Sequence, residues 1–253
     1  MTTIAITGSA RGIGAATARL LASRGHHVLL GDLEAPTALA QELGGTAGVL
    51  DVTDEASYAA WLALVPRVDV LVNNAGIMWV GAWDAEPAGV AEKQFAVNVH
   101  GVQRGTRLAV AQGARHVVTV ASAASYIAPA GEATYAATKH AVHGWMKAVR
   151  QELRGRVEIS LVMPTVVETE LAAGTAHGGV PRLTPEQVAT AVADVIETPR
   201  FEVFVPRRVG LLTRVLAVLP QRGRDLMHRR LVPDQVRDTD RSAREAYESK
   251  RLS

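Results

Sequence analysis

Short apolar runs rich in Val, Ile and Leu alternate with longer amphipathic stretches along most of the chain. The short runs have the length and composition of buried β-strands, and the stretches between them have helical periodicity. We expect strands near residues 3–7, 27–31, 47–51, 68–73, 116–121, 157–163 and 201–205. The longest helices should span about 88–112 and 134–153. This alternation predicts an α/β fold, a Rossmann-type doubly wound parallel sheet of about seven strands.

A later helix has an explicit start signal at Thr184-Pro-Glu-Gln187. The pattern is a capping box with proline at the first helical position. Residues 170–183 contain Gly174, Gly178 and Gly179 and show no periodicity. We interpret this stretch as a flap over a ligand, with a plain surface loop as the alternative.

Composition narrows the functional classes. The 253 residues include no cysteine, which excludes disulfides and a thiolate metal site. Of the eight histidines, His140 and His143 are three apart, but we see no convincing ligand spacing and expect no metal. The chain enters its first strand at once and contains no run of 18 apolar residues. We therefore expect neither a signal peptide nor a membrane span, and a cytoplasmic location.

A glycine-rich turn follows the first apolar run, in Gly8-Ser-Ala-Arg-Gly12-Ile-Gly14. Strand, glycine turn and helix together point backbone N–H groups and a helix N-terminus at a pyrophosphate. Gly8 should permit the tight turn, Gly12 should let the backbone approach the phosphates, and Gly14 should let the helix pack on the strand. Alone, such a turn is weak evidence for a dinucleotide-binding site.

Polar residues end the next apolar runs. Asp32 ends the second run 18 residues beyond Gly14, where a dinucleotide fold places a carboxylate for the adenosine ribose. The third run ends at Asp51 and Val52, which could lie at the adenine edge. The fourth stops in Asn73-Asn74-Ala75-Gly76, close to where the nicotinamide half should lie.

Tyr135 and Lys139 lie four residues apart in a helical stretch, so their side chains share one face. A tyrosine titrates near ~10, and a cation within roughly 4–6 Å lowers that pKa. Lysine is rare here, because only four of the 27 basic residues are lysines. Its compact ammonium suits contact with both a phenol and a sugar hydroxyl. An ordinary surface Tyr/Lys pair is the alternative.

Taken together, these motifs resemble the short-chain dehydrogenase/reductase family over about residues 3–205. The matching elements, in order, are Thr7-Gly8-x-x-x-Gly12-Ile13-Gly14, Asn73-Asn74-Ala75-Gly76, Asn98, Ser122 and Tyr135-x-x-x-Lys139. The resemblance implies an NAD(P)-dependent oxidoreductase acting on CH–OH groups.

The resemblance also implies roles for the residues. Tyr135 would be the general acid/base that takes the alcohol proton while hydride leaves the carbon, or the reverse. Lys139 would lower the Tyr135 pKa and hold the nicotinamide ribose. Ser122 would stabilise the substrate oxygen, with a helix N-cap as the alternative. Asn98 would interrupt its helix and hold a water linked to Lys139, with a buried asparagine satisfying local backbone as the alternative. The expected cofactor contacts are Gly8, Arg11, Gly12, Ile13, Gly14, Asp32, Asp51, Val52, Asn74, Ala75, Gly76, Tyr135, Lys139, Pro164, Val167 and Thr169.

Pro164-Thr165 replaces the Pro-Gly that the family usually has after its sixth strand. We expect a narrowed pocket and retained cofactor binding, because Thr169 still fits the family's threonine for the carboxamide. For the cofactor, the Asp32 carboxylate opposes a 2′-phosphate, at a cost of about 4 kcal/mol at ~4 Å and an effective dielectric near ~20. Arg11 would offset part of this, but no basic residue follows Asp32. We predict NAD.

The substrate pocket should be apolar. Its expected lining favours a hydrophobic secondary alcohol or ketone, steroid-like or lipid-derived, over an acyl-carrier-linked 3-oxoacyl group. Two other functions stay open, an NADPH-dependent reductase and a catalytically silent dinucleotide-binding regulator. The expected pocket residues are Met78, Val80, Trp83, Tyr126, Ile127, Val166 and Leu171.

The tail differs in charge from the rest of the chain. Residues 207–253 hold 12 Lys and Arg against 6 Asp and Glu, a net charge of +6, whereas the whole chain carries +2. We divide the chain into a catalytic Rossmann domain, 1–206, and a helical, basic extension, 207–253. We expect the extension to pack near the substrate entrance and at the interface of a homodimer or homotetramer. A membrane surface and disorder are the alternatives, and we expect no nucleic-acid partner. The apolar residues that need burial are Val209, Leu211, Leu212, Val215, Leu216, Val218 and Leu219.

Overall fold

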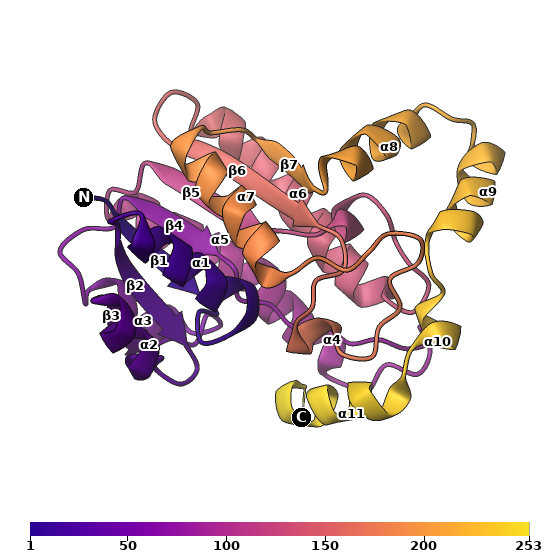
Figure 1. The fold of residues 1–253 in the computed structure, drawn as a ribbon, viewed down its shortest axis with the longest axis horizontal. Helices are drawn as coiled ribbons and strands as arrows, with labels where there is room; N and C mark the ends of the chain where they lie inside the picture. The colour runs from indigo at the N-terminus through magenta and orange to yellow at the C-terminus, as the bar shows by residue number, and fades with distance from the viewer. Residues whose placement is uncertain (253) are drawn as a thin grey trace.

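Seven parallel strands form one sheet in the order β3-β2-β1-β4-β5-β6-β7 (Figure 1). The computed structural model describes residues 1–252, and only the backbone of residues 214–217. The predicted α/β doubly wound sheet is confirmed. Its strands are β1 (Thr3–Thr7), β2 (His27–Asp32), β3 (Thr46–Val49), β4 (Val70–Asn73), β5 (His116–Val120), β6 (Glu158–Pro164) and β7 (Glu202–Val205).

Helices cover both faces of the sheet. One face packs against α1, α2 and α7, and the other against α3, α5 and α6. The helices of the domain are α1 (Gly12–Ser23), α2 (Thr37–Leu43), α3 (Glu55–Leu62), α4 (Val90–Phe95), α5 (Gly101–Ala111), α6 (Ala133–Glu152) and α7 (Pro185–Glu197). Short 3-10 turns lie at Ala123–Ser125 and Glu170–Ala172. The capping box predicted at Thr184 is present at the start of α7.

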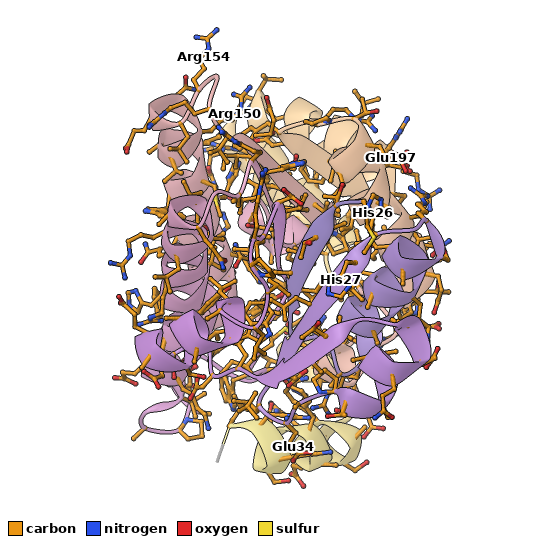
Figure 2. The ribbon with its side chains drawn as sticks, turned by 90° about the vertical axis from the view of Figure 1, so that its left-hand side faces the viewer. His26, His27, Glu34, Arg150, Arg154 and Glu197 are labelled. Carbon is orange, nitrogen blue, oxygen red and sulfur yellow. The ribbon has the colours of Figure 1, made fainter. Side chains whose placement is uncertain are left out.

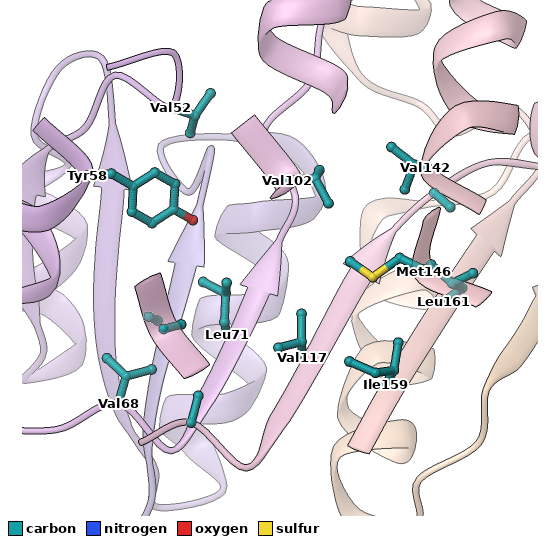
Figure 3. Packing of buried hydrophobic residues seen from close by; sticks show 14 of the residues in the cluster. Val52, Tyr58, Val68, Leu71, Val102, Val117, Val142, Met146, Ile159 and Leu161 are labelled. Carbon is teal, nitrogen blue, oxygen red and sulfur yellow. The ribbon is translucent and has the colours of Figure 1, made fainter. Parts of the chain in front are cut away.

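Branched aliphatic side chains fill both faces of the central strands, as a sheet buried on both sides requires. Every residue of β5 is buried. On one face Leu71, Val117 and Ile159 lie side by side, and Leu161 lies close to Met146 of α6 (Figure 3). Trp61 is buried at the end of α3, where its indole nitrogen donates to the Leu30 carbonyl at 3.0 Å.

The chain reverses its strand order between β1 and β4, which pair directly. In an open parallel sheet, ligands bind in the crevice outside the carboxyl ends of the strands at such a point. The direction of β2 can be followed in Figure 2, where His26 and His27 lie at its start and Glu34 lies beyond its carboxyl end. Glu34 is at the same end of the molecule as the last helix of the tail (Figures 1 and 2).

A π-helical segment, Ala96–His100, joins α4 to α5. The helix expected over 88–112 is therefore a composite that runs from Val90 to Ala111. A π turn inserts one residue into the helical ladder and is often found at functional sites. Asn98 lies at its centre.

The tail forms four helices that curve around the carboxyl ends of the strands (Figure 1): α8 (Arg207–Ala217), α9 (Gln221–Leu231), α10 (Gln235–Asp238) and α11 (Arg241–Arg251). Some of its apolar side chains are buried, and others are exposed to solvent. Val209 is buried, whereas Leu211 is 69% and Val218 is 82% exposed. The side chains of Val215 and Leu216 lie outside the described residues. Within the described part of the chain, no helix is both long and apolar enough to cross a bilayer.

Candidate active site

A cavity of about 1110 Å³ lies at the carboxyl ends of the strands. The glycine turn, the ends of β2, β4, β5 and β6, the start of α6, residues 164–180 and the tail all contribute to its wall. Sixteen of the residues predicted from the sequence line it: Gly8, Arg11, Gly12, Ile13, Asp32, Asp51, Val52, Asn74, Ala75, Gly76, Ser122, Tyr135, Lys139, Pro164, Val167 and Thr169. Gly14 and Asn98 do not reach the cavity and lie behind its wall.

The glycine turn has the conformation that its sequence predicts. Gly12 has φ +52°, a left-handed conformation that side chains disfavour. A Cβ added to Gly14 would lie 2.2 Å from the Gly8 carbonyl oxygen, so only glycine lets α1 pack this closely. The Asn74 amide donates to the carbonyls of Thr7 and Gly8, at 3.0 and 2.9 Å. Asn74 therefore holds the turn in place from the neighbouring strand.

The Asp32 carboxylate lines the cavity at the end of β2. It accepts hydrogen bonds from the backbone N–H groups of Ala10 and Leu33, at 3.0 and 2.9 Å. Arg11 turns toward residues 170–180 instead and forms an ion pair with Glu170 at 2.8 Å. The acidic end of β2 is therefore not neutralised by the arginine of the glycine turn. Asp51 similarly lines the cavity, and its carboxylate accepts from the backbone and hydroxyl of Thr53.

Ser122 and Tyr135 both line the cavity, and the Ser122 side chain interacts with the Tyr135 phenol. Ser122 ends the β5 segment and caps the short 3-10 turn, because its Oγ accepts from the Ala124 N–H at 3.0 Å. The capping role considered from the sequence is therefore real, and it coexists with the contact to Tyr135. That contact fixes the phenol at the cavity wall.

The protonation of Tyr135 differs from the sequence prediction. Burial raises the pKa of Tyr135 above its usual value and the nearby Glu132 raises it further, while the Ser122 hydrogen bond opposes them. Burial also lowers the pKa of Lys139 to about 8. The Lys139 Nζ lies 5.4 Å from the centre of the Tyr135 ring. Tyr135 therefore does not have the lowered pKa expected from the sequence, because burial outweighs the effects that favour the phenolate. The contribution of Lys139 to the phenolate stays a prediction.

Asn98 is buried, and both the nitrogen and the oxygen of its side-chain amide form hydrogen bonds. It donates to the Ile77 carbonyl at 2.8 Å and to Thr138 Oγ1 at 3.1 Å, and it accepts from the Ile77 N–H at 2.9 Å. Asn98 thus joins the π turn, the segment after β4 and α6. A Cβ added to Gly76 would lie 3.3 Å from Asn98 Oδ1 and 3.9 Å from Lys139 Nζ, so this glycine keeps the lysine accessible. The water-holding role of Asn98 stays a prediction.

The substrate end of the cavity is more polar than predicted. Met78, Tyr126, Ile127, Val166 and Leu171 line it as expected, together with Thr165. Two of the expected residues do not line the cavity. Val80 is fully buried in the cluster behind the wall, where its side chain packs with apolar neighbours, and Trp83 is 82% exposed on the surface.

Three residues that the sequence analysis did not select lie at this end: Glu132, Arg244 and Tyr247. Glu132 and Tyr247 line the cavity, and Tyr247 interacts electrostatically with Tyr135. For Glu132 the only sequence signal was an acidic residue at the start of the helix that carries Tyr135. For Arg244 and Tyr247 it was their spacing of three on an amphipathic helix, which places them on one face.

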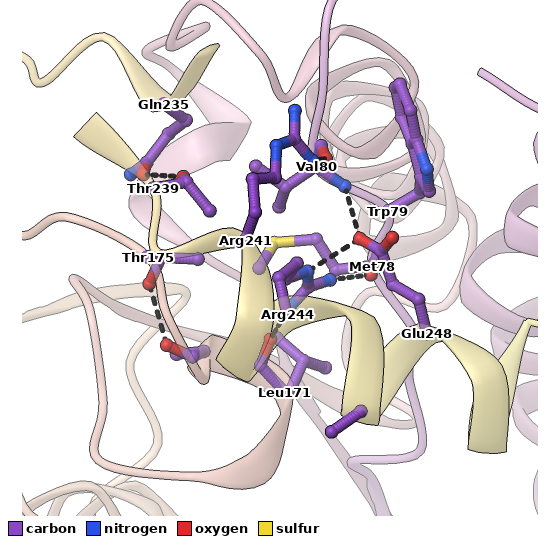
Figure 4. Close-up of polar contacts among 12 residues, drawn as sticks. Met78, Trp79, Val80, Leu171, Thr175, Gln235, Thr239, Arg241, Arg244 and Glu248 are labelled. Atoms are coloured by element: carbon purple, nitrogen blue, oxygen red, sulfur yellow. Dashed lines mark hydrogen bonds and ion pairs between the residues drawn. The ribbon is translucent and has the colours of Figure 1, made fainter. Parts of the chain in front are cut away.

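Arg244 is fully buried and joins α11 to two walls of the cavity (Figure 4). Its guanidinium donates to the carbonyls of Met78 and Leu171 and to Glu248, the last at 2.8 Å. It also lies over the Tyr247 ring, 4.4 Å from the ring centre. The last helix of the tail is therefore built into the site.

The two histidines of α6 have local partners. His143 is buried, and its Nε2 lies 2.8 Å from Glu202 Oε1 and 3.2 Å from the Tyr126 hydroxyl. His140 bonds the Ala136 carbonyl one turn earlier. Within residues 1–252, no cluster of three or more His, Asp or Glu is arranged to hold a metal.

Comparison with known proteins agrees with this geometry. The family model described as short chain dehydrogenase matches residues 2–178. The oxidoreductase UcpA of Escherichia coli is 32% identical over 231 residues, covering 85% of this chain and 87% of UcpA. Estradiol 17-beta-dehydrogenase 11 of Mus musculus is 30% identical over 247 residues, covering 90% of this chain and 83% of the relative.

Solved structures share the fold and bind related dinucleotides. A short chain dehydrogenase/reductase from Burkholderia phymatum, in complex with NAD, has a TM-score of 0.75 at 25% identity, covering 92% of this chain and 96% of its own. An alcohol dehydrogenase from Thermococcus sibiricus, complexed with 5-hydroxy-NADP, has a TM-score of 0.71 at 26% identity, covering 81% and 95%. The chain belongs to the short-chain dehydrogenases, NAD(P)-dependent oxidoreductases that act on alcohol and ketone groups.

Proposed function

We propose that this enzyme uses NAD to interconvert a hydrophobic secondary alcohol and its ketone, with Tyr135 as general acid/base. The observation that carries the proposal is the placement of Ser122, Tyr135 and Lys139 on the wall of one cavity with the glycine turn. Gly12, Asp32, Asn74 and Lys139 on the cavity wall would hold the dinucleotide, whose nicotinamide would supply hydride to the ketone carbon or take it up from the alcohol carbon.

The side chains divide the work at the reacting oxygen. Ser122 Oγ binds the substrate oxygen and stabilises the charge that develops on it. Tyr135 gives its phenolic proton to that oxygen during reduction and removes the alcohol proton during oxidation. Its raised pKa keeps the phenol protonated and ready to donate. Lys139, with a pKa of about 8, is mostly protonated at neutral pH and favours the phenolate during oxidation.

The preference for NAD rests on the charges around the end of β2. Asp32 lines the cavity, and the residues that follow it, Leu33 and Glu34, supply no positive charge. Arg11 is paired with Glu170 at 2.8 Å, so its charge is already compensated. A 2′-phosphate beside Asp32 would therefore meet an unfavourable interaction of several kcal/mol, about 4 at ~4 Å and a dielectric near ~20.

The substrate class follows from the apolar side chains at the far end of the cavity. Met78, Ile127, Val166 and Leu171 contribute to this surface, which suits a steroid-like or lipid-derived molecule. The name of the mouse relative, an estradiol dehydrogenase, supports the same class.

We also propose that residues 207–253 are an extension that joins two or four copies of the chain. Leu211 of α8 and Val218, which directly follows α8, are 69% and 82% exposed, and burial against a second copy would remove them from water. The positive charge of the extension leaves contact with an anionic membrane surface as the competing outcome.

The decisive experiment is a turnover screen with NAD and NADP against secondary alcohols of graded size. We expect NAD to be favoured and kcat/KM to rise with the apolar area of the alcohol. Turnover should disappear in Tyr135→Phe. Preference for NADP would assign the enzyme to NADPH-dependent reduction of ketones or 3-oxoacyl groups. Binding of NAD without turnover of any alcohol or ketone would favour a dinucleotide-binding regulator.

A further inference from the structure

Glu132 is a buried carboxyl at the wall of the substrate cavity. It directly precedes α6 and is only 8% exposed. It occupies the N-cap position, but its side chain makes no capping hydrogen bond to the helix. Among the described residues, no donor forms a hydrogen bond or an ion pair with this carboxyl.

The donors around Glu132 have other partners. Arg244 is the cation that acts on it, yet the Arg244 guanidinium donates to Met78, Leu171 and Glu248. The buried Gln235 amide donates to the Ala176 carbonyl at 2.8 Å. The nearby Tyr135 hydroxyl is paired with Ser122. Glu132 is therefore left facing the cavity without a partner from the protein.

A buried polar group without a partner is uncommon, because its desolvation is not compensated. Burial raises the pKa of Glu132 to about 7, with Arg244 opposing the rise. At neutral pH a ligand that brings a hydrogen-bond donor would stabilise the carboxylate. A hydroxyl or an ammonium group has the required chemistry.

We propose that Glu132 is a specificity-determining residue, which accepts a hydrogen bond from a second hydroxyl or an ammonium group on the substrate. The inference rests on the proposed function, since Ser122 and Tyr135 already hold the oxygen of the reacting carbon. Glu132 directly precedes the helix that carries Tyr135, and it is close enough to raise the pKa of the Tyr135 phenol. The second polar group therefore lies near the reacting carbon. The substrate is an amphipathic diol, amino alcohol or the corresponding ketone.

The test compares matched alcohols in the full-length enzyme with saturating NAD. The donor-bearing probes are trans-1,4-cyclohexanediol and trans-4-aminocyclohexanol, and the matched apolar probe is 4-methylcyclohexanol. For the wild type we expect kcat/KM to favour the donor-bearing probes. In Glu132→Leu the ratio of donor-bearing to apolar kcat/KM should fall by about 10- to 100-fold, because a buried polar contact is lost. Glu132→Gln should keep part of the preference for the diol and lose the preference for the amine.

Glu245→Gln is the control variant, because Glu245 is an exposed carboxyl on α11, outside the cavity wall. It should leave the ratio as in the wild type. An unchanged ratio in both Glu132 variants would overturn the inference and leave Glu132 a structural residue, even where turnover and the Tyr135→Phe loss uphold the proposed function. If the wild type oxidises none of the probes, the same pair is tested as ligands by thermal shift with NADH present. Equal shifts from the amine and the methyl compound would then refute the role of Glu132.

Discussion

Arg244→Met should release α11 from the domain while the sheet stays folded. Arg244 is fully buried and bonds Met78 and Leu171 of two other segments and Glu248 of its own helix (Figure 4). Methionine preserves much of the apolar stem and removes every donor. The substitution therefore tests the hydrogen bonds more than the packing.

The magnitude follows from the acceptors that lose their donor. The carbonyls of Met78 and Leu171 would each be left buried and unpaired, at about 1–3 kcal/mol each. Glu248 would lose the partner of a buried ion pair, a change that typically costs about 3–5 kcal/mol in total when the remaining charge stays buried. Glu248 retains one backbone contact, from the Val80 N–H at 3.3 Å. The two carbonyls alone account for about 2–6 kcal/mol, and the partial exposure of Glu248 reduces its share. We therefore expect a loss of at least about 3–5 kcal/mol in the free energy that holds α11 in place.

The loss should be local, because α11 lies outside the sheet and contacts the domain through side-chain hydrogen bonds such as that from Arg241 to the Val80 carbonyl. Local opening of a peripheral helix commonly occurs at lower free energy than global unfolding. A loss of about 3 kcal/mol corresponds to roughly a hundredfold in the opening equilibrium.

Hydrogen exchange by mass spectrometry measures this directly. Peptides covering residues 241–251 and 170–176 should lose about a hundredfold in protection, and peptides from β1 and β5 should keep theirs. Arg237→Met is the matched control, because Arg237 is exposed on α10. Wild-type protection of residues 241–251 in Arg244→Met would refute the reasoning. A uniform loss throughout the sheet would show that Arg244 supports the whole domain instead.

Three further changes test the site and the tail. Tyr135→Phe should lower turnover at least about 100-fold, since general acid/base groups contribute about 10²–10⁴-fold to the rate. The affinity for NAD should stay within a few fold. A stopped-flow turnover rate above about a tenth of wild type would show that Tyr135 is not the general acid/base. The wild type should favour NAD over NADP by at least about tenfold in kcat/KM, because this requires only part of the repulsion between Asp32 and a 2′-phosphate to survive screening by solvent. Asp32→Ala should reduce that preference. Equal kcat/KM values of the wild type with NAD and NADP would contradict this. Deletion of residues 207–253 should make the protein insoluble or give a smaller assembly by light scattering. If the truncated protein instead keeps the mass of its assembly, its solubility and its activity but no longer binds anionic vesicles, the tail contacts a membrane surface.

Stability should depend on pH through Glu132. Its folded pKa is raised from 4.5 to about 7, so the folded state holds its proton more tightly and loses stability as pH rises through that window. Glu132→Gln removes this loss. Relative to wild type, the variant should gain about 1–3 kcal/mol between pH 5 and pH 8, measured by urea unfolding. An equal effect of the substitution at both pH values would contradict the raised pKa.

The fold and most of the cofactor wall could be predicted from local sequence. Strand, glycine turn and helix are encoded within about 25 residues, and their geometry depends on backbone properties that Gly12 and Gly14 impose directly. Asp32 was predictable for the same reason, since its place is set by the end of a strand. The spacing of Ser122, Tyr135 and Lys139 likewise brought them to one cavity.

The protonation of the site and its outer wall could not be predicted in this way. The pKa of Tyr135 depends on burial by segments distant in sequence, and a local Tyr/Lys spacing contains no information about them. Glu132 looked like an acidic residue at a helix start, a position favoured by the helix dipole. Its lack of a partner becomes visible only when the tail and residues 164–180 close around it.

The tail and residues 170–176 contact each other at several points. Glu170 pairs with Arg11 at 2.8 Å and lies 3.9 Å from Arg251. The Asp240 N–H donates to the Gly174 carbonyl at 2.8 Å, and Gln235 forms two hydrogen bonds with the backbone of Ala176. Displacement of residues 170–176 therefore breaks contacts to the glycine turn and to the tail together. Residues 170–176 and the tail thus share one set of hydrogen bonds and ion pairs, and variants that loosen α11 should loosen residues 170–176 as well.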